Sequence, residues 1–347
     1  MEPTSMVVLL TSIVTYFCIY IMLALSTNLE YGYTGIPNFG KVFYYAVGAS
    51  VSAIIASRLY NAFIGAEDVF SAPAATQRVL LASKNPLLAI GIFALSTFMG
   101  ALVAGVLGYL SSYPALRLTE DFLAITLLVF GEAGRIIMRT YEPLIGGVYG
   151  ISGIPNPFRW VKYGVLSRAL YTVIVVAFTV LTFMIVERLA NSPFGRVMKA
   201  IRDDELAAKV LGKDAARVKG QVLLIGSVIS GIAGSLYTFY SQAIFPDDFV
   251  PPFTFFIISM VLLGGTSNNV GVVLGSILLA VVDRFTQAST LSLIGLSFPF
   301  DITYARYMLI GLIMVLVLML RPEGLVPEKP VKTPALKVLS ESINRNY

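Results

Sequence analysis

The chain has 347 residues, of which 56% are hydrophobic and 13% are charged, and its mean hydropathy is +0.80. Soluble domains carry about 25% charged residues, so about half of the usual solubilising surface is missing and the apolar share exceeds what a core buries. This composition excludes an ordinary soluble protein and predicts one that faces lipid.

The residue counts also exclude several kinds of chemistry. The sequence has no histidine and one cysteine, Cys18, which lies in an apolar run. These counts exclude His-based catalytic triads, Cys-rich metal sites and internal disulfides, so we expect no catalytic residues, metal or cofactor. The net charge of +5 is not gathered beside aromatic residues on a polar face, and we expect no nucleic-acid partner.

Stretches without Asp, Glu, Lys or Arg predict the membrane spans, because about 20 apolar residues cross a bilayer core. Five stretches are near or above this length: Pro3–Leu29, Asn85–Leu116, Ala169–Val186, Gly220–Pro246 and Phe249–Val282. Four shorter pieces need flanking polar residues to span: Val42–Ser57, Phe122–Gly131, Phe285–Phe300 and Tyr307–Leu320. The predicted fold is an all-α polytopic integral membrane protein with about 8–9 transmembrane helices, some of them broken. No basic region or cleavage site marks the first span as a removable signal peptide.

Lysine and arginine collect in two places, and this bias sets the orientation because cytoplasmic loops are enriched in them. One place is residues 187–219 and the other is the tail from Arg321. We therefore expect a transmembrane domain over residues 1–327 that contains a cytosolic segment at 187–219, followed by a cytosolic tail at 328–347. The acidic pair at 247–248 then lies outside, as does the N-terminus, five spans before residue 187.

The last long uncharged stretch is interrupted by polar residues and glycines. They fall at membrane depth and are Gly264, Gly265, Thr266, Ser267, Asn268, Asn269 and Gly271. Backbone groups freed from a helix at that depth need protein or water as partners. Two interpretations remain open, a broken helix that marks a permeation route and a tight turn between two short spans. Small residues spaced by four, such as Ser227 with Gly231, predict close helix packing.

The cytosolic segment is expected to contain a short helix. Ser192 suits the cap, Pro193 the first helical position and Gly212 the stop. An exposed patch of small and apolar residues is expected on it, rimmed by charges; the patch is Ala207, Ala208 and Leu211, and the rim includes Arg202, Asp204 and Glu205. From these residues alone, the segment is either a docking site for a partner or a solvated connector on the membrane surface.

Other charged residues invite functional interpretations that the sequence does not favour. Gly35–Lys41 fits part of a phosphate-binding loop, but the next residue is not the Ser or Thr that binds magnesium, so we interpret it as a turn between spans. Glu132 and Arg135 are interpreted as a mutually neutralised pair near the interface rather than a proton or substrate site. Asp283 and Arg284 are interpreted as charges at the boundary of a span.

The cytosolic run "SPFGRVMKAIRDDELAAKVLGKDAARVK", followed by "GSVISGIAGSLYTFYSQAIFPDDF", resembles the inner-membrane permeases of branched-chain amino acid ABC importers, the LivM type in particular. Five further segments resemble the same family in the family's order: "NLEYGYTGIPNFGKVFYYAVGAS", "YPALRLTEDFLAITLLVFGEAGRI", "IGGVYGISGIP", "MVLLGGTSNNVGVVLGSILL" and "RPEGLVP". Together the segments span most of Asn28 to Pro327.

The resemblance implies an importer subunit that does not itself hydrolyse ATP. Such permeases work with a second, related permease, two cytosolic ATPases and an extracellular or periplasmic substrate-binding protein, within the lipid of the inner (cytoplasmic) membrane. The segment from Glu205 resembles the coupling helix that docks in an ATPase groove, so we expect the ATPase-coupling residues to be Arg202, Asp204, Glu205, Ala207, Ala208, Leu211 and Gly212. The implied substrate is a branched-chain amino acid or a related small polar solute such as urea.

A path for a zwitterionic solute is expected to be polar but uncharged, because a fixed charge would hold one end too tightly to release it. We expect this path along the broken helix and, from the opposite half, at Asn28, Gly32 and Gly35. The alternative function is an ion-coupled secondary transporter or channel, which is expected to hold isolated carboxylates or histidines in mid-span. The five long spans hold none. An intramembrane enzyme is a third class, for which no nucleophile with a base stands out.

Overall fold

The computed structural model describes residues 3–115, 118, 120–286, 302–321 and 323–328. Its first half contains α1 (Pro3–Thr27), which continues as the π-helical turn η1 (Asn28–Gly32), then α2 (Lys41–Ile64), α3 (Ala72–Lys84), α4 (Pro86–Leu110), α5 (Ser112–Ala115), α6 (Glu120–Thr140), α7 (Glu142–Ile145), η2 (Gly147–Tyr149) and β1 (Ile151–Ser152). Its second half contains α8 (Gly164–Asn191), α9 (Pro193–Asp203), α10 (Glu205–Val210), α11 (Ala215–Ser241), β2 (Ala243–Ile244), η3 (Pro246–Asp248), α12 (Pro251–Gly264), α13 (Asn269–Phe285) and α15 (Ile302–Leu320).

Six helical segments among the described residues are long and apolar enough to cross a membrane: Met6–Gly32, Lys41–Ile64, Pro86–Pro114, Gly164–Asn191, Ala215–Ser241 and Pro246–Gly264. The predicted all-α polytopic membrane fold is confirmed. Helices α6, α13 and α15 pack against this set. The predicted span Phe285–Phe300, apart from its first two residues, and the tail beyond residue 328 lie outside the described residues.

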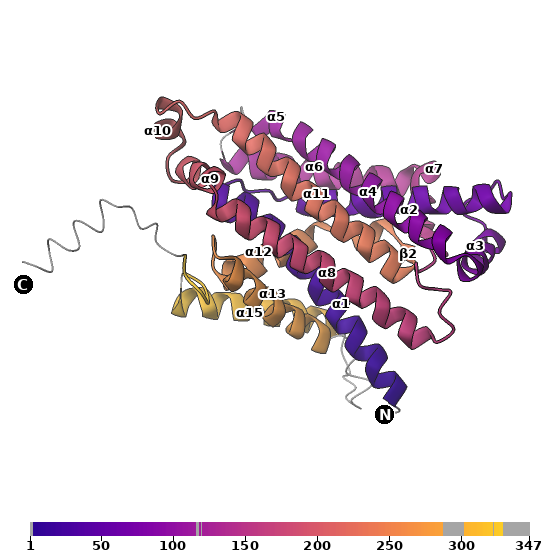
Figure 1. Cartoon of the computed structure of the whole chain (residues 1–347). Coiled ribbons are helices and arrows are strands. Elements are labelled where there is room, and N and C mark those ends of the chain that lie inside the picture. The colour runs from indigo at the N-terminus through magenta and orange to yellow at the C-terminus, as the bar shows by residue number, and fades with distance from the viewer. Residues whose placement is uncertain (1–2, 116–117, 119, 287–301, 322, 329–347) are drawn as a thin grey trace, which may run out of the picture.

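The long helices run side by side between two ends of the molecule (Figure 1). One end holds α3, α7 and the short antiparallel pair β1–β2, in which Ile151 lies opposite Ile244. The other end holds α5, α9 and α10. We call these the outer end and the inner end, after the predicted topology.

The stretch Phe249–Val282, which we predicted as one span, is a hairpin of two helices. A Cβ added to Gly264 would lie 2.4 Å from the carbonyl oxygen of Gly271, and one added to Gly275 would lie 2.4 Å from that of Met260. Helices α12 and α13 therefore lie antiparallel in close contact, with the polar residues 265–268 as the turn. Gly264, Gly265, Ser267 and Asn268 are buried, so this turn lies within the protein. The geometry is that of the tight turn, and a permeation route along it stays a prediction.

Glycines bring α2, α4 and α11 into backbone contact. A Cβ on Gly48 of α2 would lie 2.2 Å from the carbonyl oxygen of Gly231 on α11, and one on Gly100 of α4 would lie 2.8 Å from that of Gly48. Ser235 donates a hydrogen bond from its hydroxyl to the Gly48 carbonyl at 3.2 Å. These contacts confirm the packing predicted from small residues spaced by four.

We predict that Gly48→Ala destabilises the protein by about 1–3 kcal/mol, because the new methyl group overpacks a closed helix contact. Gly91→Ala is the matched control, since a Cβ at Gly91 of α4 meets nothing within 4 Å. Thermal unfolding of the two purified variants in the same detergent checks this. Equal transition temperatures would contradict the proposed role of Gly48.

Candidate functional site

The segment at 187–219, which we predicted to be cytosolic and call the cytosolic segment after that prediction, begins and ends as its sequence predicts. The Ser192 hydroxyl accepts a hydrogen bond from the Gly195 amide, with Pro193 at the first helical position. Gly212 has φ of 76° and follows the last helical turn. The segment is not one helix, however. Asp204 has extended backbone and caps α10 by accepting from the Ala207 amide at 2.9 Å, because a short carboxylate competes well for free amides.

The apolar surface of α10 differs from the predicted patch. Ala208 is only 3% exposed and packs against Ile201 of α9 and Ala215 of α11. The exposed apolar side chains are Leu206, Val210 and Leu211, which are 75%, 87% and 77% exposed. Ala208 is therefore not part of the exposed patch, because it packs the segment against the rest of the chain. The bulkier Leu206 and Val210 belong to the patch instead. We call Leu206, Val210 and Leu211 the α10 patch.

Two ion-pair groups hold this segment in place. Glu205 contacts Lys209 at 2.7 Å and Lys219 at 2.6 Å. Partial burial alone would raise the pKa of the Glu205 carboxyl, but its bonds to these two ammonium groups hold the pKa below its ordinary value. Arg202, which was expected beside Glu205 at the charged rim, pairs with Asp203 and Glu328 instead.

Arg202 connects α9 to the membrane helices. Its guanidinium donates to the carbonyl oxygen of Gly32 at 3.0 Å, to the hydroxyl of Ser267 and to the carboxylate of Glu328 at 3.0 Å. Gly35 has φ of 71°, and a Cβ there would lie 3.2 Å from the Arg202 Cγ. One side chain of the cytosolic segment thus contacts the end of α1, the α12–α13 turn and the residues that follow α15.

The residues predicted for the translocation path come together at the inner end. Asn28 donates from its amide to the side chain of Asn269 at 3.0 Å and accepts from the Ser267 amide at 2.9 Å. Asn268 caps α13 through the amides that follow it, and Asn269 donates to Glu187 at 2.7 Å. We call Asn28, Gly32, Ser267, Asn268 and Asn269 the inner cluster. All five are buried, so the cluster is closed packing rather than an open lining.

The chain after α15 covers the α12–α13 turn. The amides of Leu325 and Val326 donate to the carbonyl oxygens of Leu263 and Gly264 at 2.9 and 3.1 Å. Asn268 donates from its side chain to the carbonyl of Pro327 at 2.9 Å. Backbone groups freed at the turn therefore have protein partners, as such groups must within a membrane.

A buried ion pair joins the ends of α1 and α2. Lys41 Nζ is 2.8 Å from Glu30 Oε1, and both side chains are fully buried. Asn38 donates to the other carboxylate oxygen at 2.9 Å, and Lys41 also donates to the Gly226 carbonyl at 3.3 Å. A Cβ on Gly226 would lie 1.9 Å from Glu30 Oε1, so only glycine leaves room for the carboxylate. The stretch that resembled a phosphate-binding loop is the connection between these helices, as interpreted.

A second group of charges lies at the outer part of α6. Arg135 bonds both to Glu132 and to Asp247 of η3, the latter at 2.9 Å, and Arg139 lies 3.4 Å from Asp247. Pairing of Glu132 with Arg135 is confirmed. The side chains of Arg139 and Asp247 are 47% and 55% exposed, and that of Glu132 is 30% exposed. We call these four residues the α6 charge group.

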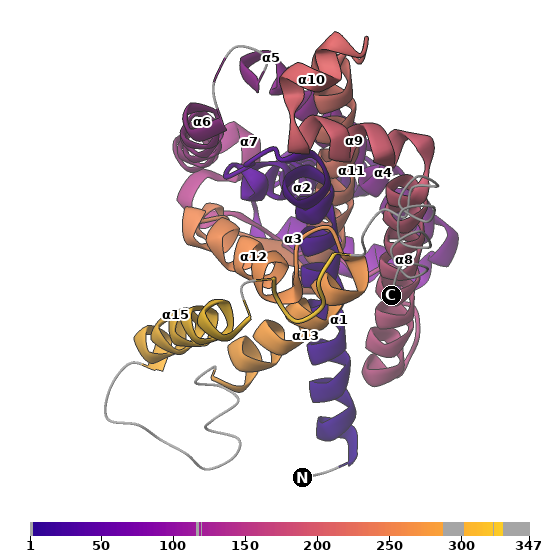
Figure 2. The ribbon, with the colours of Figure 1, turned by 90° about the vertical axis from the view of Figure 1, so that its left-hand side faces the viewer.

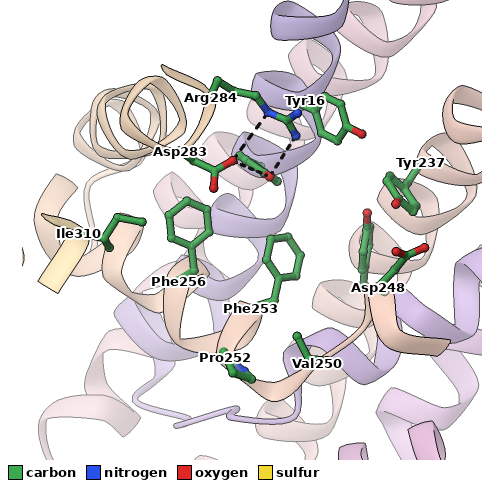
Figure 3. Close-up of a pocket in the computed structure, with 12 residues that line it drawn as sticks. Tyr16, Tyr237, Asp248, Val250, Pro252, Phe253, Phe256, Asp283, Arg284 and Ile310 are labelled. Carbon is green, nitrogen blue, oxygen red and sulfur yellow. Dashed lines mark hydrogen bonds and ion pairs between the residues drawn. The ribbon is translucent and has the colours of Figure 1, made fainter. Parts of the chain in front are cut away.

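Toward the outer end, a cavity of about 410 Å³ lies between α1, α2, α11, η3, α12, α13 and α15. Figure 3 shows Arg284 and Asp283 on one side of it, Asp248 and Tyr237 on the other, and Phe253 between them. Its lining residues come from segments far apart in the sequence; they are Tyr16, Tyr20, Tyr45, Tyr237, Asp248, Val250, Pro252, Phe253, Phe256, Asp283, Arg284 and Ile310.

Arg284 is held in this cavity by ring and charge contacts. Its guanidinium carbon lies 3.2 Å from the centre of the Tyr16 ring. Its Nε is 3.7 Å from Asp283 Oδ2, and its Nη2 donates to the Tyr20 hydroxyl at 3.4 Å. Tyr20 in turn donates to Asp283 at 3.4 Å. We did not predict this site from the sequence, although tyrosines four residues apart on α1 and adjacent opposite charges at the end of a span are features that indicate it.

We predict that Lys41→Met lowers the free energy of unfolding by about 3–5 kcal/mol, because it leaves the Glu30 carboxylate buried without its cation. The double variant Glu30→Gln, Lys41→Met should recover most of this loss, since neither charge is then buried. Denaturation of both variants and of Glu30→Gln in detergent completes a double-mutant cycle. Additive effects of the two substitutions would contradict the interaction.

Comparison with known proteins matches residues 9–318 to a family described as the branched-chain amino acid transport system permease component. The chain is 38% identical over 334 residues to a probable branched-chain amino acid transport permease protein LivM of Methanocaldococcus jannaschii, covering 95% of this chain and 96% of that one. It is 28% identical to the high-affinity LivM of Escherichia coli K12, over 94% of this chain and 71% of the relative, and 23% identical to the LivH permease of the same strain, over 89% and 94%. No solved structure was found to match. The chain therefore belongs to the family of permease components of branched-chain amino acid transport systems.

Proposed function

We propose that the chain is the membrane-spanning permease subunit of an ATP-driven importer of branched-chain amino acids or a related small polar solute. The observation that carries the proposal is the 38% identity, along nearly the whole chain, to a protein described as a LivM permease. The alternative, an ion-coupled carrier, is less well supported, because the buried carboxylate of Glu30 is bonded to Lys41 and Asn38. A coupling site needs a carboxylate that gains and loses its ion.

In this proposal two ATPases bind at the inner end, one of them on the α10 patch. Exposed apolar side chains rimmed by Asp204 and Lys209 have the character of an interface centre with a charged rim. Of the other predicted coupling residues, Ala207 and Leu211 lie on the surface of this helix. The position of the helix on the rest of the chain is set by Arg202, Glu205, Ala208 and Gly212. In this proposal the segment is a docking site rather than a solvated connector.

The inner cluster is proposed as the closed inner end of the translocation path, together with its neighbours Gly35, Gly264, Gly265 and Gly271. Its support is the position of Arg202, which bonds to Gly32 and Ser267 from α9. A displacement of α9 by an ATPase would therefore act directly on the end of α1 and on the α12–α13 turn. Such a switch between two packed arrangements is a common way to transmit closure.

A second, related permease is proposed to lie against α6, with a substrate-binding protein at the outer end. Glu132 lies eight residues before the end of α6, which is about 12 Å along the helix. Its side chain and those of its partners are partly exposed, and exposed apolar residues such as Val129 and Ile136 lie beside them. Charges that face lipid are costly, so this face suits a polar route shared with another subunit. LivM and LivH of one bacterial strain both resemble this chain, which supports a related pair.

We predict that Leu211→Asp weakens association with the ATPases roughly 10- to 150-fold, because about 1.5–3 kcal/mol of apolar burial is lost. Co-purification of the ATPases with the complete transporter, together with leucine uptake by proteoliposomes, measures this. Val148→Asp at the outer end, where Val148 is 53% exposed, is the matched control and should retain the ATPases. ATPase retention and uptake at wild-type levels in Leu211→Asp would show that α10 is not the docking helix. Ala208→Trp is a poorer test, since Ala208 is buried in the chain's own packing.

For α6 we predict that Glu132→Cys, in a Cys18→Ser background, reacts with a water-soluble, membrane-impermeant thiol reagent in the assembled transporter. Phe98→Cys on α4 is the control, because Phe98 is 60% exposed but lies among apolar residues and should face lipid. Mass spectrometry of the labelled chain measures both positions. If Glu132→Cys is as unreactive as Phe98→Cys, this face of α6 does not border a polar route.

A further inference from the structure

We propose that the outer cavity binds the transported solute as a zwitterionic α-amino acid with an aliphatic side chain. The inference rests on the proposed function and adds a binding site to it. The cavity, at about 410 Å³, falls in the range of about 300–1,000 Å³ that small-molecule sites occupy. Six of its twelve lining residues are aromatic, and its charged side chains lie on two sides, Arg284 with Asp283 on one and Asp248 on the other (Figure 3).

The charges suit an α-amino acid because that ligand carries both of its charges on one carbon. A site that recognises it needs a cation and an anion next to each other. Arg284 and Asp283 provide this, with 3.7 Å between Nε and Oδ2. The guanidinium offers several donors to a carboxylate, and Asp283 accepts from an ammonium, while the Tyr20 hydroxyl lies within 3.4 Å of both side chains. A solute with one charge would match only half of this arrangement.

The remaining wall suits an aliphatic side chain. Phe253, Phe256 and Ile310 line the cavity beside the charged side, and Phe253 and Phe256 stack with their ring centres 6.2 Å apart. Tyr20 meets Phe256 edge to face. These rings are fixed by one another, so they present a rigid apolar surface to a branched side chain. A polar solute such as urea has no group that this wall would bury.

The site is built for weak binding, which a transporter needs in order to release its solute. Asp283 and the Tyr16 ring already contact Arg284, so a bound carboxylate competes with interactions inside the protein. We expected from the sequence that a path for a zwitterionic solute carries no charge, whereas the proposed site carries a pair of opposite charges. Opposite charges that neutralise each other do not hold one end of the solute permanently.

The test uses Val250→Cys in the Cys18→Ser background of the complete transporter, because Val250 lines the cavity and is partly exposed. Leucine should slow alkylation of this cysteine about tenfold once its concentration exceeds the dissociation constant roughly tenfold. Leucinamide, which lacks the carboxylate, and 4-methylpentanoate, which lacks the ammonium, should protect far less at the same concentration. Val148→Cys, exposed at the outer end but outside the cavity, should react at one rate throughout.

Arg284→Gln added to the same background should weaken leucine protection about 30-fold or more, whereas Arg58→Gln, an exposed arginine at the outer end, should leave it unchanged. If the wild-type transporter imports leucine but leucine leaves Val250→Cys unprotected, or protects no better than its two analogues, the cavity is not the site. If the wild type imports neither an amino acid nor another small polar solute, the proposed function fails instead, whereas import of a solute such as urea but of no amino acid overturns only the assignment of the cavity. The analogue comparison needs no change at Arg284, so it decides the matter even if Arg284→Gln does not fold.

Discussion

The buried ion pair between Glu30 and Lys41 constrains the inner half of the molecule. Each charge is fully buried, and burying either one without the other costs several kcal/mol, so α1, α2 and α11 have to assemble together. The π-helical turn η1 contains Glu30, and Gly226 of α11 leaves the space that the carboxylate occupies. Residues 31–40 lie between the two members of this pair in the sequence. The pair therefore helps to hold Asn28, Gly32 and Gly35 at the inner end.

The segment at 187–219 bonds directly to the connection that this ion pair anchors. Arg202 bonds to the Gly32 carbonyl, and Ser267 of the α12–α13 turn bonds to the same oxygen at 2.7 Å. Behind α10, Lys219 ties Glu205 to the start of α11. α9 contacts α8 and α11, and α10 contacts α11, on the side of the molecule that faces the viewer in Figure 2. A force on α10 therefore reaches several membrane helices through short, directional contacts.

The outer half is organised differently. Its charges are paired across elements, as Arg135 is with Asp247 of η3, because an isolated charge at membrane depth is expensive. Between these helices a cavity lined by aromatic rings remains, whereas the inner cluster is closed. A closed inner end and a hollow outer end are compatible with the importer that we propose.

The sequence by itself determined the membrane class, the family, most of the span positions and the caps at Ser192 and Gly212, because hydropathy, length and capping depend on residues close together in the chain. Only the tertiary structure decided that Phe249–Val282 folds back as a hairpin, since a polar turn at that depth needs partners from residues 325–327, which no local pattern reveals. The tertiary structure also buried Ala208, gave Arg202 its partners and gathered the tyrosines of α1 around Arg284. These features depend on which distant segments meet, and that is decided by the packing of the helices as a whole.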